Sequence, residues 1–170
     1  SRYRLWVNGR AVLSGPLKGD GWRQYYETID VSNYLKPGFN CIAVKVIASP
    51  VFESKTHGNS APLSVITNGA GPKLMLDGVC RSDKGRILAD VTTGRGDWHV
   101  TLDRAIEWVP SEDTHMVGAM EKVDGALLPH GWMDEAELDE NWFPAEIHWV
   151  AEGSPSQNQH GLIQPMALQE

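Results

Sequence analysis

Short runs of alternating apolar and polar residues, separated by Gly, Pro, Asn and Asp, make up most of this chain. Such runs are typical of β-strands with one buried face, because successive side chains of a strand point to opposite faces. The clearest run covers residues 3–7 and ends in Asn8-Gly9. Asn and Gly tolerate the positive φ angles of a two-residue hairpin turn, so residues 10–14 are predicted to return as the partner strand.

The same pattern predicts further elements. The expected strands cover residues 23–29, 40–48, 63–66, 73–79, 87–91, 98–102 and 147–150. Residues 30–35 are predicted to form one helical or 3₁₀ turn, because Asp30 or Ser32 can accept backbone N–H bonds and Pro37-Gly38 ends it. Residues 134–142 are compatible with a short acidic helix, and residues 103–130 are ambiguous. Short strands with frequent turns favour an all-β sandwich.

Size and composition narrow the function classes. The 170 residues fit one domain, and we expect a β-sandwich over residues 1–150 and a polar linker and exit segment over 151–170. The net charge of −7, without a basic cluster, speaks against a nucleic-acid partner, and no apolar run is long enough to span a membrane. Cys41 and Cys80 lack metal-site spacing, so free thiols are favoured over a disulfide or zinc.

The first fifty residues also carry a family resemblance. Residues 3–9 read YRLWVNG, residues 26–38 read YETIDVSNYLKPG, and residues 40–46 read NCIAVKV. They resemble the "YxLxVNG" strand and the "yD(V/L)(T/S)xYLxxGxNxIAVxV" block of β-sandwich modules attached to bacterial α-L-rhamnosidases and related glycoside hydrolases. Further along, residues 74–78 with 92–98, residues 134–145 and residues 161–165 are similar to later segments of these modules. One departure follows the third strand, where residues 47–52 replace a Gly-Asp/Asn-Gly-Trp motif.

The resemblance implies a jelly-roll β-sandwich of the galactose-binding-domain-like type, with one or two short helices. It implies a non-catalytic accessory domain that packs against the catalytic barrel of the parent enzyme, holds carbohydrate substrate near it, or both. In those enzymes the catalytic carboxylates sit in the barrel, so we expect no catalytic residue and no glycosidase activity here. The alternatives are an independent carbohydrate-binding module assisted by calcium and a purely structural spacer.

Sugars bind through aromatic faces and through side chains that form paired hydrogen bonds. The glycine-rich loop from Gly15 to Tyr26 offers both, and a second turn-rich stretch offers two more candidates. The candidate carbohydrate-binding residues are Asp20, Trp22, Arg23, Gln24, Tyr25, His130 and Trp132. Trp22 could equally close the edge of the sandwich as a core residue.

Two other motifs give weaker indications of function. The acidic residues of 134–140 lack the spacing of a calcium loop and are expected to form a solvated turn, so no metal ligand or cofactor is assigned. Arg95-Gly96-Asp97 spells an integrin-type tripeptide where a β-turn is expected. The compartment and the parent enzyme stay open.

The start of the chain raises one more expectation. In the resembled modules other strands precede the "YxLxVNG" strand, whereas here it begins at Tyr3. A missing strand would leave an open sheet edge. We expect residues 162–168 to fill it, a second copy to pair with it as a homodimer, or the strand set to differ from that of the family.

Overall fold

A computed structural model describes residues 2–17, 23–47, 72–109, 120–134, 138–147 and 162–165. The chain divides into two compact units. The first unit contains residues 1–72, 103–136 and 155–170, and the second contains residues 73–102 and 137–154. Strands dominate the described residues, and their helical segments are two 3₁₀ turns of three residues each. The predicted all-β class is therefore confirmed, although the sheets are small.

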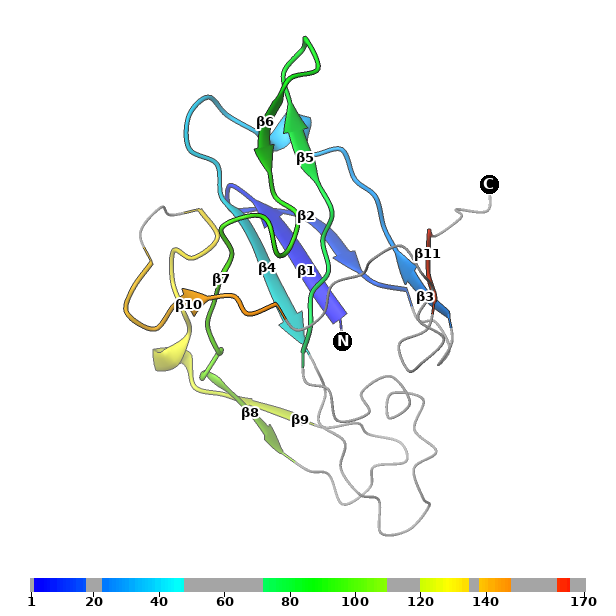
Figure 1. The fold of residues 1–170 in the computed structure, drawn as a ribbon. Helices are drawn as coiled ribbons and strands as arrows, with labels where there is room; N and C mark the ends of the chain where they lie inside the picture. The colour runs from blue at the N-terminus through cyan, green and yellow to red at the C-terminus, as the bar shows by residue number, and fades with distance from the viewer. Residues whose placement is uncertain are drawn as a thin grey trace. The chain divides into compact units, whose positions relative to one another are not determined.

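The first unit is built on a three-stranded antiparallel sheet with the order β2-β1-β4 (Figure 1). Its elements are β1 (Arg2–Val7), β2 (Arg10–Gly15), β3 (Arg23–Tyr26), η1 (Ser32–Tyr34), β4 (Ile42–Ile47), β8 (Ile106–Val109), β9 (Met120–Val123), η2 (Gly125–Leu127) and β11 (Leu162–Pro165). The predicted first hairpin, the 3₁₀ turn and the strand near residue 42 are confirmed. The strand predicted over residues 23–29 ends at Tyr26.

The β1–β2 hairpin follows from its turn residues. Asn8 and Gly9 have φ angles of 49° and 77°, which are the positive values that a two-residue hairpin turn requires. The ladder then shifts, because Trp6 pairs with Ala11 but Leu5 pairs with Leu13. Val12 is therefore the extra residue of a β-bulge in β2.

The buried apolar residues among those described are Leu5, Val7, Ala43 and Ala105. Leu5 and Val7 are two positions apart on β1 and share one face of the sheet, where they pair with Val44 and Ile42 of β4. Ala43 pairs with Trp6 and lies on the other face. Each face of the three-stranded sheet therefore carries at least one buried residue.

The hairpin of β8 and β9 falls in the stretch that the sequence left ambiguous. The two strands pair antiparallel from Ile106 with Val123 to Val109 with Met120. Ahead of β8, the Asp103 carboxylate accepts a hydrogen bond from the N–H of Ala105 at 3.1 Å and pairs with Lys45 of β4 at 2.5 Å. This ion pair ties the start of the hairpin to the three-stranded sheet.

The C-terminal segment β11 pairs with β3 in parallel, from Leu162 with Arg23 to Pro165 with Tyr26. The first strand is not an edge, since β1 lies between β2 and β4. One of the three expected alternatives was that residues 162–168 fill an open edge beside the first strand. Residues 162–165 do form a strand, but it pairs with β3 and not with the sheet of β1. Homodimerisation stays a prediction.

The second unit contains β5 (Val79–Arg81), β6 (Ile87–Asp90), β7 (His99–Val100) and β10 (Phe143–Pro144). The strand predicted from residue 73 begins only at Val79. Before Val79, the carbonyls of Leu76 and Gly78 accept the backbone N–H groups of Thr93 and Val91. The N–H groups of Leu76 and Gly78 donate to the hydroxyls of Thr93 and Thr92, so the backbone ladder is incomplete there. The turn at residues 82–86 and the strand after it are confirmed.

Three further predictions need correction. The predicted strand 98–102 is limited to His99 and Val100, which pair with Pro144 and Phe143. Ile147 lies outside any strand, and residues 148–150 and 63–66 fall outside the described residues. The acidic helix is wrong for the described residues 134 and 138–142, which form turns. There the Asp139 carboxylate accepts the N–H of Asn141 at 2.8 Å, a local bond that competes with a helix.

The core of the first unit yields a stability prediction. Leu5→Ala removes most of a side chain that is 6% exposed at the centre of the sheet. We expect the free energy of unfolding, measured by urea denaturation, to fall by about 2–5 kcal/mol. Leu127→Ala is the matched control, because Leu127 is 55% exposed and its truncation should cost less than about 1 kcal/mol. Equal losses in the two variants would contradict this assignment of the core.

Candidate functional site

The side chain of Asn8 joins three segments of the first unit. Its amide N–H groups donate to the carbonyl of Tyr34 and to the side-chain oxygen of Asn40, both at 2.9 Å. Its oxygen accepts the N–H of Cys41 at 3.0 Å. The β1–β2 turn, the η1 segment and the start of β4 are therefore connected through one side chain.

Asn40 closes the loop that follows η1. Its amide nitrogen donates to the carbonyls of Lys36 and Gly38, at 2.8 and 3.0 Å. Its oxygen accepts the N–H of Lys36 at 2.8 Å. Both asparagines of the resembled motif thus stabilise backbone and leave little free hydrogen-bonding capacity for a ligand.

Glu27 connects the two ends of the predicted sugar-binding loop. Its carboxylate accepts the phenol O–H of Tyr3 at 2.5 Å and the backbone N–H of Leu17 at 3.0 Å. Burial, followed by the bond to Glu27 and its charge, raises the pKa of the Tyr3 phenol well above its ordinary value. The phenol therefore stays a hydrogen-bond donor well into the alkaline range.

The first group of candidate residues comes from the loop between Gly15 and Tyr26, and the structure describes only some of them. Asp20 and Trp22 lie outside the described residues, whereas Arg23, Gln24 and Tyr25 lie on β3. Tyr25 is half-buried. The side-chain contacts of Asp20 and Trp22 stay predictions.

The second group lies in the turn that follows η2. His130 is exposed, whereas Trp132 is half-buried and packs edge-to-face on Trp6, with ring centroids 5.2 Å apart at 73°. Within the described part of the chain, no hydrogen bond or aromatic contact joins Tyr25 to His130 or Trp132.

Sequence reasoning missed Trp6, which contacts Trp132, and Arg4, which contacts Trp6. The guanidinium of Arg4 lies over the Trp6 ring, 6.0 Å from its centroid. Residues i and i+2 of a strand share a face, so this spacing was the available signal. We call Arg4, Trp6 and Trp132 the tryptophan cluster. It combines aromatic surface with a cationic donor, two features that can serve sugar binding.

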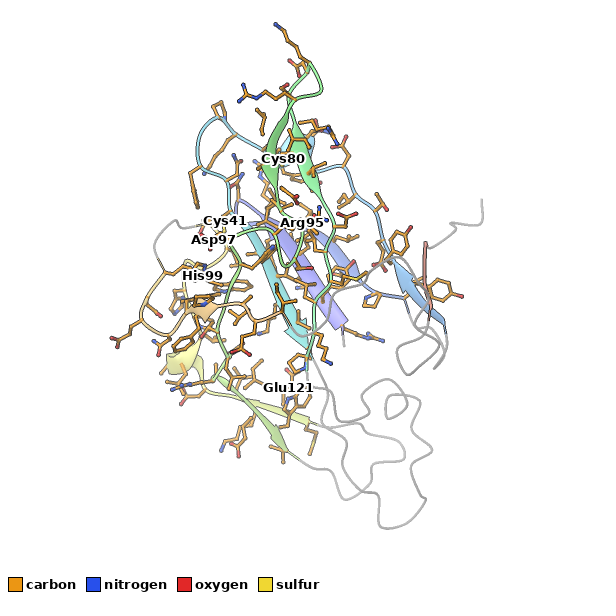
Figure 2. The ribbon with its side chains drawn as sticks, in the orientation of Figure 1. Cys41, Cys80, Arg95, Asp97, His99 and Glu121 are labelled. Carbon is orange, nitrogen blue, oxygen red and sulfur yellow. The ribbon has the colours of Figure 1, made fainter. Side chains whose placement is uncertain are left out.

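The hairpin of β8 and β9 borders an open depression of about 400 Å³. Its rim carries both signs of charge, from Arg104, Glu107, Lys122 and Asp124. Glu107 and Lys122 pair with each other at 3.4 Å, and Glu121 on the same strand is exposed (Figure 2). The mixed charges favour no ligand class.

The integrin-type tripeptide occupies a well-defined turn of the second unit. The N–H groups of Arg95 and Gly96 donate to the carbonyl of Thr92, at 2.9 and 2.8 Å. The Arg95 and Asp97 side chains are 74% and 94% exposed, and Asp97 lies 3.7 Å from a ring nitrogen of His99 (Figure 2). Arg95 also pairs with Asp90 at 3.7 Å, so the turn is explained by local bonds.

The described residues offer neither a metal site nor a membrane-spanning helix. They contain no group of three or more His, Cys, Asp or Glu arranged to hold a metal ion. They also contain no helix that is long and apolar enough to cross a membrane. Cys41 and Cys80 are free and half-buried, and Cys80 lies on β5 (Figure 2).

Comparisons with models of protein families, with curated proteins and with solved structures found no match for this chain.

The environment of Cys41 predicts its reactivity. Burial and then the negative charge of Asp134 raise the pKa of the Cys41 thiol, and the thiol donates to the carbonyl of Trp132 at 3.7 Å. Because the thiolate is the reactive form, labelling by an aromatic disulfide should accelerate only as the pH rises through this raised pKa. In a Cys80→Ser background, Asp134→Asn should shift the rate–pH curve to lower pH.

The control for this experiment is Asp139→Asn, which neutralises an aspartate of the other unit. It should leave the labelling curve of Cys41 unchanged. Identical curves for Asp134→Asn and Asp139→Asn would show that Asp134 does not act on the thiol.

Proposed function

We propose that this chain is a non-catalytic accessory domain of an α-L-rhamnosidase-like glycoside hydrolase, with a jelly-roll β-sandwich as its complete fold. The main support for the proposal is that the residues of the resembled motif form strands and turns that bond to one another in the structure. Its strand, Asn-Gly turn, Asp-x-Ser turn and second strand all belong to one continuous arrangement around β1. This arrangement supports the proposal, because the Asn-Gly turn and the two asparagines of the resembled motif each bond where the strands need them.

The proposed task is to hold carbohydrate near the catalytic domain of the parent enzyme. Two groups of residues supply suitable chemistry. One is the tryptophan cluster with the exposed His130. The other is known mainly from the sequence and consists of Asp20, Trp22, Arg23, Gln24 and Tyr25, of which Tyr25 is a half-buried residue of β3. Rhamnose has an apolar methyl group and several hydroxyls, so aromatic faces beside paired donors suit it.

The described carboxylates with several bonds serve the fold, which supports a non-catalytic role. Glu27 binds Tyr3 and Leu17, and Asp103 binds Lys45 and Ala105. A glycosidase needs two carboxylates about 5–10 Å apart, one to donate a proton and one to attack or activate water. Carboxylates committed to structural bonds are poor candidates for those tasks.

The first test concerns catalysis. Incubation of the purified chain with an aryl α-L-rhamnoside is expected to release no aryl alcohol above the buffer rate. Turnover that follows the protein through purification and disappears when one carboxylate is replaced by its amide would overturn the non-catalytic role.

The second test concerns binding. We expect titration with L-rhamnose or a rhamnose-containing oligosaccharide to give heat of binding and a shift in tryptophan fluorescence. Trp22→Ala should weaken the affinity about tenfold or more, as loss of one stacking contact of roughly 1–2 kcal/mol implies. Phe39→Ala is the control, because it truncates an aromatic residue of the same unit that is 51% exposed.

Parallel circular dichroism separates the outcomes of this titration. If Trp22→Ala unfolds the domain, at a cost of about 3–5 kcal/mol, Trp22 is a core residue and the loop site is wrong. Titration with and without calcium distinguishes the calcium-assisted module. A folded wild-type domain that binds none of these sugars would leave the spacer as its function.

A further inference from the structure

The carboxylate of Glu27 occupies a space that exists because residue 15 is glycine. Gly15 pairs directly with Tyr3 across the β1–β2 ladder, so a side chain at position 15 would lie on the same face as the phenol. A Cβ atom built on Gly15 would lie 2.6 Å from each Glu27 carboxylate oxygen. The missing side chain thus leaves room for the carboxylate beside the Tyr3 hydroxyl.

Glu27 also follows directly after β3, the strand that carries three of the candidate sugar-binding residues. Its two hydrogen bonds reach β1 through Tyr3 and the segment after β2 through Leu17. Charge-assisted bonds of this kind are stronger than neutral ones, and a half-buried carboxylate can hold its partners firmly. The end of β3 is therefore connected to β1 and to the segment that follows β2.

We propose that Glu27 is a positioning residue, whose carboxylate fixes the end of β3 against the β1–β2 hairpin and so sets the placement of this strand, with the half-buried Tyr25, for a carbohydrate ligand. We call Tyr3, Gly15, Leu17 and Glu27 the carboxylate clasp. The ligand part of this inference rests on the proposed function. The structural part concerns only described residues and can be tested without a ligand.

The structural test is amide hydrogen exchange on the full chain. Glu27→Ala should accelerate exchange of the Leu17 amide by roughly tenfold to hundredfold, as expected for loss of a bond to a charged acceptor. It should also move ionisation of the Tyr3 phenol to lower pH, read as phenolate absorbance against Tyr3→Phe. Glu107→Ala is the matched control, because Glu107 is an exposed glutamate of the same unit. An unchanged Leu17 amide in Glu27→Ala would overturn the clasp.

A double-mutant cycle tests the role of Gly15. Gly15→Ala should displace the carboxylate and accelerate Leu17 exchange as Glu27→Ala does. The second change should then add little, so the double variant should resemble either single variant. Fully additive effects would mean that Gly15 and Glu27 act separately, against the clasp.

The ligand test uses L-rhamnose and the rhamnose-containing oligosaccharide. With the fold retained by circular dichroism, Glu27→Ala should weaken binding at least fivefold and Glu107→Ala should not. Faster Leu17 exchange with unchanged affinity would overturn the positioning role. A wild-type domain that binds neither sugar would overturn the proposed function instead, and the exchange experiment would still decide the clasp.

Discussion

The side-chain amide of Asn8 is the interaction on which the three-stranded sheet of the first unit depends. Backbone groups in the segments beside the hairpin turn need hydrogen-bond partners. Asn8 donates to the carbonyl of Tyr34 and to the side chain of Asn40 and accepts the N–H of Cys41. Its own backbone takes the positive φ that asparagine tolerates. Because its partners come from the η1 segment and the start of β4, local turn geometry and long-range sheet order are set by the same residue.

The elements around Asn8 could be predicted from the sequence because their signals are local. An Asn-Gly pair between alternating runs and an aspartate two residues before a serine each specify a backbone shape within a few positions. The strand limits were less predictable. Glu27, which alternation assigned to a strand, uses its side chain to bind Tyr3 and Leu17 instead. Hydrogen bonds to residues so far away in the sequence do not change the alternation of apolar and polar residues, so the alternation does not predict them.

The second unit shows a different limit. The hydroxyls of Thr92 and Thr93 accept backbone N–H groups fourteen and seventeen positions earlier. The stretch predicted as a strand over residues 73–79 is therefore held partly by these hydroxyls and partly by backbone bonds. β-Branched composition signals extended backbone but cannot distinguish these two kinds of support. At the candidate sites, residue types were readable from the sequence, whereas the contact of Trp132 with Trp6 depends on tertiary structure.

The extra residue Val12 has a consequence that reaches beyond its own strand. In a regular ladder counted from the turn, Tyr3 would face Ser14, whose Cβ would stand beside the phenol. The bulge advances β2 by one position, so that Tyr3 faces Gly15. One inserted residue thus changes the parity of the strand and exchanges a side chain for an empty volume. The number of residues between the turn and the far end of β2 therefore determines whether glycine stands opposite Tyr3. It thereby determines whether the Glu27 carboxylate fits beside the phenol.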